Sequence, residues 1–137
     1  MFRDRIIVGD SLVARADEYS VTARIPWYRA LPLSCLVEVT LVVDGEAVPT
    51  SALEIEVDGV RRPFAELAPL YDVWWYVRDD LIIHVAGRLA DRAEHEVDLA
   101  LALRIPYLPE ADVPLVIRER LVITTPARIA ADSATVA

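Results

Sequence analysis

The clearest structural signal in this chain is the stretch HEVDLALALRI, residues 95–105. Its side chains alternate in character from one position to the next. One set is aliphatic and the other is mostly charged or small: Val97, Leu99, Leu101, Leu103 and Ile105 against Glu96, Asp98, Ala100, Ala102 and Arg104. Because successive side chains of a β-strand point to opposite faces, this period of two predicts a strand with one face in a core and the other toward solvent.

The same period recurs on both sides of this stretch. LVEVTLVV (36–43) and LEIEV (53–57) alternate in the same way, and each is followed by an Asp-Gly dipeptide, a sequence typical of tight hairpin turns. Further strands are predicted at residues 6–8, 20–25 and 115–124. The chain is therefore expected to be built from strands along most of its length.

Two details of the strand pattern lead to specific expectations. DVWWYV (72–77) and LIIHV (81–85) flank Arg78-Asp79-Asp80, which predicts a hairpin between them. In the strand at 115–124, Glu119 falls on the otherwise apolar face. A β-bulge near Glu119 would restore the register of that strand.

About eight to nine short strands with turn signals between them predict an all-β fold, an antiparallel β-sandwich. Helical periodicity is weak, and its best candidate at 86–96 contains Gly87 and runs into a strand, so we expect a loop there. We expect a single domain over residues 1–125. The alternation is lost at 126–137, which predicts a frayed C-terminal tail.

Composition narrows the class of protein. Hydrophobic residues make up 55% of the chain, enough for a core, and the net charge is −8. Nucleic acid is an unsuitable partner for so acidic a chain, because phosphate binding needs clustered positive charge. No segment resembles a signal peptide or a membrane span, so a cytoplasmic location is expected. The single cysteine, Cys35, lies in an apolar run typical of a buried thiol.

A short motif occurs twice: RIPWYRALPLS at 24–34 and RIPYLP at 104–109. In both copies the proline ends a predicted strand, and the arginine, Arg24 or Arg104, points away from the core. In one interpretation the prolines only stop the strands and the aromatic rings fill the ends of the sandwich. In the other, Trp27, Tyr28, Arg29 and Tyr107 form a rim that contacts a partner or ligand, since aromatic residues and Arg are enriched at interfaces.

A second aromatic group lies in YDVWWYVRDD, residues 71–80. Alternation places Trp75 on the core face and leaves Trp74 and Tyr76 on the other side, where another segment such as FAELAPL (64–70) or a second subunit should cover them. The predicted partner interface or active-site rim thus consists of eight residues: Arg24, Trp27, Tyr28, Arg29, Trp74, Tyr76, Arg104 and Tyr107.

The search for catalytic residues finds none in this chain. There is no phosphate-binding glycine loop, nucleophile elbow or cysteine pair for zinc. His84 shares a strand face with Ile82. His95 stands among acidic residues, a pattern more typical of a solvated strand entry than of a metal site. Asp79 and Asp80 resemble turn residues rather than a catalytic pair. No metal ligands are predicted.

Four segments together carry a family resemblance: IIVGDSL, RIPWYRALPLS with the following LVVDGEAVP, YDVWWYVRDDLIIHV, and LALRIPYLP. In this order, and over roughly residues 6–122, the chain resembles the small β subunit of bacterial C-glycoside deglycosidases. These enzymes cleave the carbon–carbon bond between a sugar and an aromatic aglycone of the flavonoid type. The resemblance is a pattern of segments, and no catalytic residue carries over from it.

The resemblance implies a heteromeric lyase in which this chain is an auxiliary β-sandwich, inactive alone. The partner would be a larger α subunit with an isomerase- or epimerase-like barrel that holds the base and a divalent metal such as manganese. An upstream sugar 3-oxidoreductase would supply the substrate, a 3-keto C-glucoside. Two other functions remain open from the residues: a stand-alone carbohydrate- or aromatic-binding sandwich, and a non-enzymatic assembly module.

Overall fold

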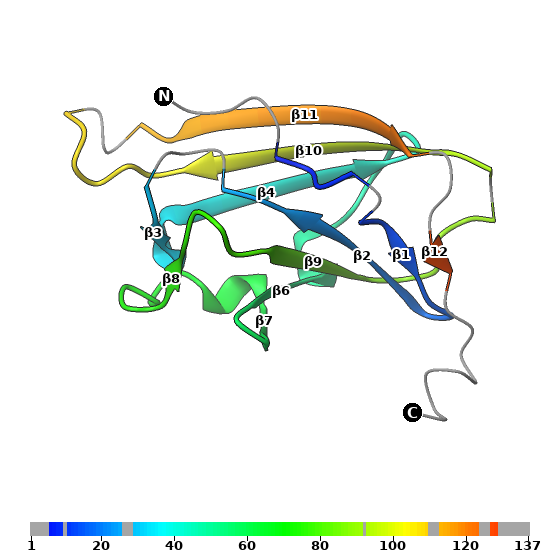
Figure 1. Cartoon of the computed structure of the whole chain (residues 1–137), viewed down its shortest axis with the longest axis horizontal. Helices are drawn as coiled ribbons and strands as arrows, with labels where there is room; N and C mark the ends of the chain where they lie inside the picture. The colour runs from blue at the N-terminus through cyan, green and yellow to red at the C-terminus, as the bar shows by residue number, and fades with distance from the viewer. Residues whose placement is uncertain are drawn as a thin grey trace.

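The protein is described by a computed structural model at residues 6–9, 11–25, 29–91, 93–109, 113–123 and 127–128. Two sheets form the layers of a sandwich (Figure 1), with strand orders β12-β1-β2-β9-β6-β7 and β11-β10-β4-β5. A third sheet, β3-β8, lies at one end. The strands are β1 Val13–Ala14, β2 Glu18–Ala23, β3 Leu31–Pro32, β4 Leu36–Val43, β5 Glu46–Ala47, β6 Leu53–Val57, β7 Val60–Pro63, β8 Trp74–Trp75, β9 Leu81–Ala86, β10 His95–Leu103, β11 Leu115–Ile123 and β12 Ala127–Arg128. Three single-turn 3₁₀ helices are η1 Leu33–Cys35, η2 Thr50–Ala52 and η3 Phe64–Glu66.

The predicted all-β sandwich is confirmed. Every strand pair in the described residues is antiparallel except β1 with β12, which is parallel. The core lies between the two larger sheets. It receives the alternate side chains of the central strands: Val97, Leu99 and Leu101 of β10, Val39 and Leu41 of β4, Val21 of β2, Leu81 and Ile83 of β9, and Leu53 and Ile55 of β6.

The two Asp-Gly dipeptides form the turns that the sequence predicts. Asp44 and Gly45 join β4 to β5, and Asp58 and Gly59 join β6 to β7. All four residues have positive φ, between 51° and 82°. A type I′ hairpin turn needs positive φ at both central residues, and Asp followed by Gly tolerates this conformation well.

The predicted hairpin of residues 72–77 with 81–85 is wrong. β9 pairs with β2 on one edge and with β6 on the other, so neither edge remains for β8. β8 pairs instead with β3, and residues 76–79 form a turn that carries the chain from one sheet to another, with the Asp79 amide donating to the Tyr76 carbonyl at 3.0 Å.

The bulge predicted near Glu119 is also wrong. The register of β10 with β11 is unbroken from His95 opposite Ile123 to Leu103 opposite Leu115. Glu119 keeps its place on the inner face because its carboxylate accepts the backbone N–H groups of Ile6 and Ile7, at 2.9 and 2.7 Å. The sheet's irregularity lies elsewhere, where β10 meets β4 between Ala102 and Leu103.

The first and last described segments of the chain extend the large sheet. The predicted strand at 6–8 is reduced to one bridge, Ile7 with Ala23, and two further backbone hydrogen bonds to the same edge of β2. β12, within the predicted frayed tail, pairs with β1. The rest of that tail, residues 126 and 129–137, lies outside the described residues. The segment 87–94, apart from Arg92, which lies outside the described residues, forms the expected loop.

Candidate functional site: an aromatic end of the sandwich

In the short sheet β3-β8, two neighbouring tryptophans differ in burial: Trp75 is buried and Trp74 is exposed. Leu31 pairs with Trp75 and Pro32 with Trp74. Trp75 is 1% exposed, and its indole Nε1 donates to the Asp79 carbonyl at 3.0 Å. This hydrogen bond satisfies the only polar group of the buried side chain. Because side chains alternate along a strand, Trp74 points the other way and is 42% exposed.

A pocket of about 220 Å³ opens beside Trp74. The proline and aliphatic side chains of β3 form part of its wall, and residues after β10 complete it; the lining is Arg29, Ala30, Leu31, Pro32, Trp74, Pro106 and Tyr107. The Arg29 guanidinium carbon lies 5.2 Å from the centre of the Tyr107 ring, a cation–π distance. The site is therefore an apolar hollow bordered by two aromatic rings and one cation.

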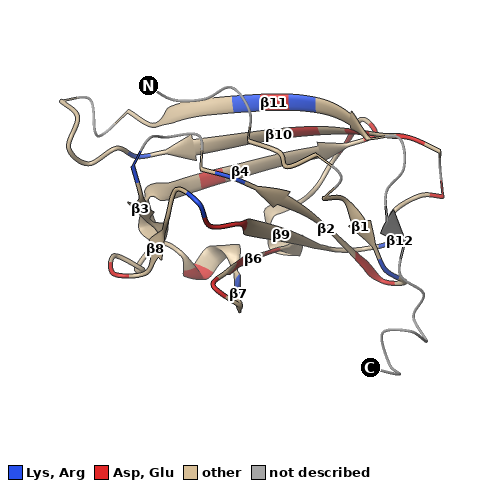
Figure 2. Cartoon of the chain, viewed as in Figure 1, with Lys and Arg blue, Asp and Glu red and all other residues tan. Residues whose placement is uncertain are grey.

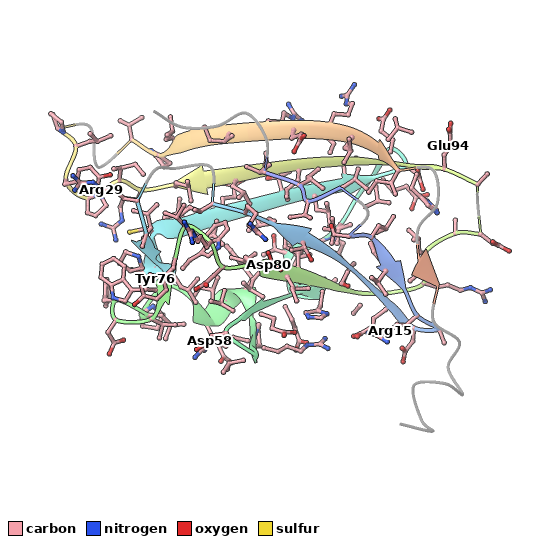
Figure 3. All side chains as sticks on the ribbon, in the orientation of Figure 1. Arg15, Arg29, Asp58, Tyr76, Asp80 and Glu94 are labelled. Carbon is pink, nitrogen blue, oxygen red and sulfur yellow. The ribbon has the colours of Figure 1, made fainter. Side chains whose placement is uncertain are left out.

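We call this region the aromatic end: β3, β8, Arg29, Tyr76 and residues 104–109. Figure 3 shows Arg29 and Tyr76 at this same end of the sandwich. Tyr76 and Tyr107 are 56% and 45% exposed, so about half of each side chain is in contact with solvent. The segment 64–70 was a candidate cover for Trp74 and Tyr76, but both rings stay exposed, so it does not enclose them.

Three of the eight predicted rim residues, Arg29, Trp74 and Tyr107, thus line one pocket. Arg24 does not join them, because its guanidinium pairs with the exposed carboxylate of Asp80. Arg104 is half-buried, and its amide donates to the Cys35 carbonyl at 2.8 Å. Trp27 and Tyr28 lie outside the described residues. The use of these residues as an interface or rim stays a prediction.

Sequence reasoning missed the wall of the pocket. Ala30, Leu31 and Pro32 belong to the first copy of the doubled motif, but no pattern within that stretch indicates that it pairs with Trp74 and Trp75. The one available signal was the proline itself, since a strand that contains proline is favoured at a sheet edge.

The histidines differ from expectation in one case. His95 is not a solvated strand entry: it is fully buried, and its Nδ1 lies 2.7 Å from Asp44 Oδ2. The other Asp44 oxygen accepts the Glu96 amide at 2.8 Å, so this turn carboxylate binds both the side chain and the backbone at the start of β10. His84 lies on the face shared with Ile82, as predicted, and its Nε2 lies 2.8 Å from Glu56.

A second charged group sits on the outer face of the four-stranded sheet. Asp98 is 6% exposed and accepts hydrogen bonds from Arg118 at 2.9 Å and Arg120 at 3.3 Å. Both arginines belong to β11, whose middle carries the blue of Lys and Arg in Figure 2. Burial by itself raises the pKa of Asp98, but the hydrogen bonds from the two arginines outweigh it and hold that pKa below its ordinary value.

Groups with metal-binding or nucleophilic potential are dispersed. Cys35 is buried, as expected, and burial raises the pKa of its thiol, which disfavours the reactive thiolate. In the described ranges, no three side chains of His, Cys, Asp or Glu gather where they could hold a metal ion. Within those same ranges, no helix has the length and apolar character that a membrane crossing needs.

Exposed aromatic rings beside an apolar pocket are typical of binding and interaction surfaces. Comparison with known proteins identifies the family to which the chain belongs. A family model described as C-glycoside deglycosidase beta subunit matches residues 6–107.

Curated relatives carry the same description. The chain is 44% identical over 119 residues to a 3'-dehydrocarminate deglycosidase beta subunit from a Microbacterium species, covering 87% of this chain and 90% of that protein. It is 38% identical over 112 residues to a C-glycoside deglycosidase beta subunit from Microbacterium trichothecenolyticum, covering 82% and 86%. Another beta subunit, from Arthrobacter globiformis, is 40% identical over 111 residues, covering 79% and 83%.

The chain belongs to the family of C-glycoside deglycosidase beta subunits. The resemblance inferred from the sequence is therefore confirmed. A beta subunit implies a partner subunit in the same enzyme complex.

Proposed function

We propose that this chain is the auxiliary subunit of a lyase that cleaves the carbon–carbon bond of a 3-keto C-glycoside. The observation that carries the substrate part of this proposal is the name of a relative 44% identical to this chain, 3'-dehydrocarminate deglycosidase beta subunit. The prefix 3'-dehydro denotes a ketone in place of a hydroxyl. A ketone at that position is the group that makes cleavage of an unactivated carbon–carbon bond chemically accessible.

The proposed reaction is a β-elimination. The ketone at sugar carbon 3 acidifies the hydrogen on carbon 2, and a base removes that proton to give an enolate. The bond from carbon 1 to the aglycone then breaks as a double bond forms between carbons 1 and 2. The electron pair leaves with the aglycone carbon, which takes up a proton, and the sugar is released as an anhydro-hexenone.

We place the base and a divalent, manganese-like metal in the partner, a larger subunit with an isomerase- or epimerase-like barrel. A metal ion beside a developing enolate supplies several kcal/mol of transition-state stabilisation. The role of the present chain is to bind that subunit. A sugar 3-oxidoreductase acting earlier would supply the ketone.

We further propose that the aromatic end faces the partner. Each of Trp74, Tyr76 and Tyr107 leaves roughly half of its surface in water. A large aromatic side chain buries on the order of 150–250 Å². At roughly 25 cal/mol per Å², covering half of such a ring gains about 2.5 kcal/mol. Exposed rings beside an arginine are the composition that interface centres favour.

The test is reconstitution. The chain is co-expressed with the proposed barrel subunit, and the purified complex is given a 3-keto C-glucoside or the parent C-glucoside with its 3-hydroxyl intact. We expect the complex to cleave the keto compound but not the parent compound, and the isolated chain to cleave neither. A chelator should abolish this activity, and manganese should restore it. Cleavage by the isolated chain, cleavage of the parent compound, or activity that survives complete metal removal would each contradict the proposal.

A further inference from the structure

We infer that the pocket of the aromatic end binds one planar aromatic group that carries a hydroxyl or anionic oxygen, the aglycone side of the substrate. This inference rests on the proposed function, and it assigns to the auxiliary chain a direct part in substrate binding. The pocket is the place in the described residues where aromatic rings, an apolar wall and a cation meet.

The size of the pocket suits a ring system. An apolar cavity of about 150 Å³ engineered into another protein holds benzene. The hollow beside Trp74 measures about 220 Å³ and is open to solvent on one side, so it can take one or two fused rings while the remainder of the molecule projects outward. A sugar would be a poor occupant, because Ala30, Leu31 and Pro32 offer little to its many hydroxyl groups.

The chemistry of the lining specifies the ligand further. Trp74 and Tyr107 present faces and edges suited to stacked or edge-to-face contacts with another ring. Arg29 lies over the Tyr107 ring, so the cation sits at the border of the pocket. A guanidinium carries five N–H donors arranged in its plane, so an arginine held over a ring can donate to a phenolic or carboxylate oxygen at the ring's edge.

The pocket is built before any ligand arrives. Leu31 is 2% exposed, and its strand is paired with β8, whose Trp75 is anchored in the core. The chain after Pro32 is held by two more backbone hydrogen bonds, from Leu33 to the Val73 carbonyl at 2.8 Å and from Ser34 to the Leu70 carbonyl at 3.0 Å. A preformed site binds its ligand without the entropic cost of ordering the wall.

The experiment uses 2-naphthoate as an anionic aromatic probe, 2-naphthol as its uncharged counterpart and cyclohexanecarboxylate as a non-aromatic control. Binding to the full chain is followed by NMR of the Trp74 indole signal, identified with Trp74→Phe, and by calorimetry. We expect Trp74→Leu and Tyr107→Leu each to weaken naphthoate binding about three- to tenfold, the worth of one aromatic pair. Arg29→Gln should weaken naphthoate more than naphthol, since charge-assisted hydrogen bonds are about twice as strong as neutral ones.

Tyr71→Leu is the matched control, because Tyr71 is an exposed ring in the segment before β8 that does not line the pocket; its affinity for naphthoate should equal that of the parent chain. Equal binding of cyclohexanecarboxylate, or unchanged affinity in both Trp74→Leu and Tyr107→Leu, overturns the inference.

Repeating the titration on the complex shows whether the aglycone or a side chain of the partner occupies the pocket. We expect naphthoate to bind the complex and to compete with the keto substrate. Loss of naphthoate binding on complex formation means that the partner fills the pocket, and this also overturns the inference. Failure of the two chains to associate contradicts the proposed function instead, and leaves probe binding to the free chain measurable.

Discussion

Glu119 is the residue whose sequence context is most misleading. It is a charged residue at an inward position of β11, yet it needs no bulge, because the amides of Ile6 and Ile7 point at one of its carboxylate oxygens. Both isoleucines are buried, so their N–H groups have little access to water. The Glu119 carboxylate, from the four-stranded sheet, thus binds residues 6–8, which run along the edge of β2 in the other sheet.

Removing this acceptor should be costly. Glu119→Ala leaves two buried N–H groups unsatisfied, and each such group costs about 1–3 kcal/mol. We expect a loss of about 2–6 kcal/mol in the free energy of unfolding in urea. The loss should be smaller for Glu119→Gln, which keeps one acceptor oxygen, and almost zero for Val122→Ala, an exposed change on the same strand. If Glu119→Ala and Val122→Ala unfold at the same urea concentration, the carboxylate does not satisfy these amides.

The lowered pKa of Asp98 predicts how the stability of the fold depends on pH. Its pKa is lowered in the folded chain, so it binds its proton less readily folded than unfolded, and its stabilising effect is complete above the unfolded pKa of about 3.9. That effect is lost as the pH falls through the lower, folded value. Asp98→Asn should therefore cost about 1–2 kcal/mol at pH 7, and the difference from the parent chain should shrink below about pH 4.

Urea unfolding of both proteins at several pH values checks this prediction. Glu38→Gln, at an exposed carboxylate on the neighbouring β4, is the control and should follow the parent chain throughout. A difference between Asp98→Asn and the parent that is the same at pH 3 and pH 7 would mean that the charge of Asp98 is not what stabilises the sheet. Salt should reduce the effect, since both arginines are mostly exposed.

Among the strands, β8 has the largest role for its length. Its two residues place one tryptophan in the core and the other in the pocket. Trp75→Ala should lower stability by about 3–5 kcal/mol, the usual cost of deleting a large buried ring. Trp74→Ala combined with Tyr76→Ala should change stability by less than about 1 kcal/mol and weaken binding of the barrel partner.

Thermal melting of the isolated chain and sizing of the complex distinguish the two effects. Val116→Ala with Val122→Ala, on the outer face of β11, is the exposed control pair and should leave both properties unchanged. Should the Trp74 and Tyr76 double variant melt far below the parent chain and still associate normally, the rings serve internal packing and the aromatic end does not face the partner.

The strands with strict alternation could be predicted from sequence, and their partners could not. β4, β6 and β10 appear close to where the pattern places them, because an apolar face of period two has to be buried. The hairpin of 72–77 with 81–85 failed because pairing depends on which edges are vacant, and β9 has none. The pocket could be predicted only in part: alternation exposes Trp74, but the wall comes from a β3 pairing that no local pattern specifies.

Considered as one body, the molecule presents different chemistry at its two ends. Figure 3 places Arg29 and Tyr76 at one end and Arg15 and Glu94 at the other. The far end carries charged turns such as Arg15 with Glu18, whereas the aromatic end carries exposed rings and an apolar pocket. With a net charge of −8, most of the surface favours water over another protein. This asymmetry supports an orientation in which the aromatic end meets the partner.

The hydrogen bonds between Glu119 and the amides of Ile6 and Ile7 should also affect the rates of folding and unfolding. Its two hydrogen bonds join positions 113 and 112 residues apart, nearly the whole chain. Contacts of such long range carry a loop-closure entropy cost, so we expect these two hydrogen bonds to form late in folding. An interaction absent from the transition state leaves the folding rate unchanged and slows unfolding. We therefore expect the Glu119 carboxylate to slow unfolding of the folded chain without changing its folding rate.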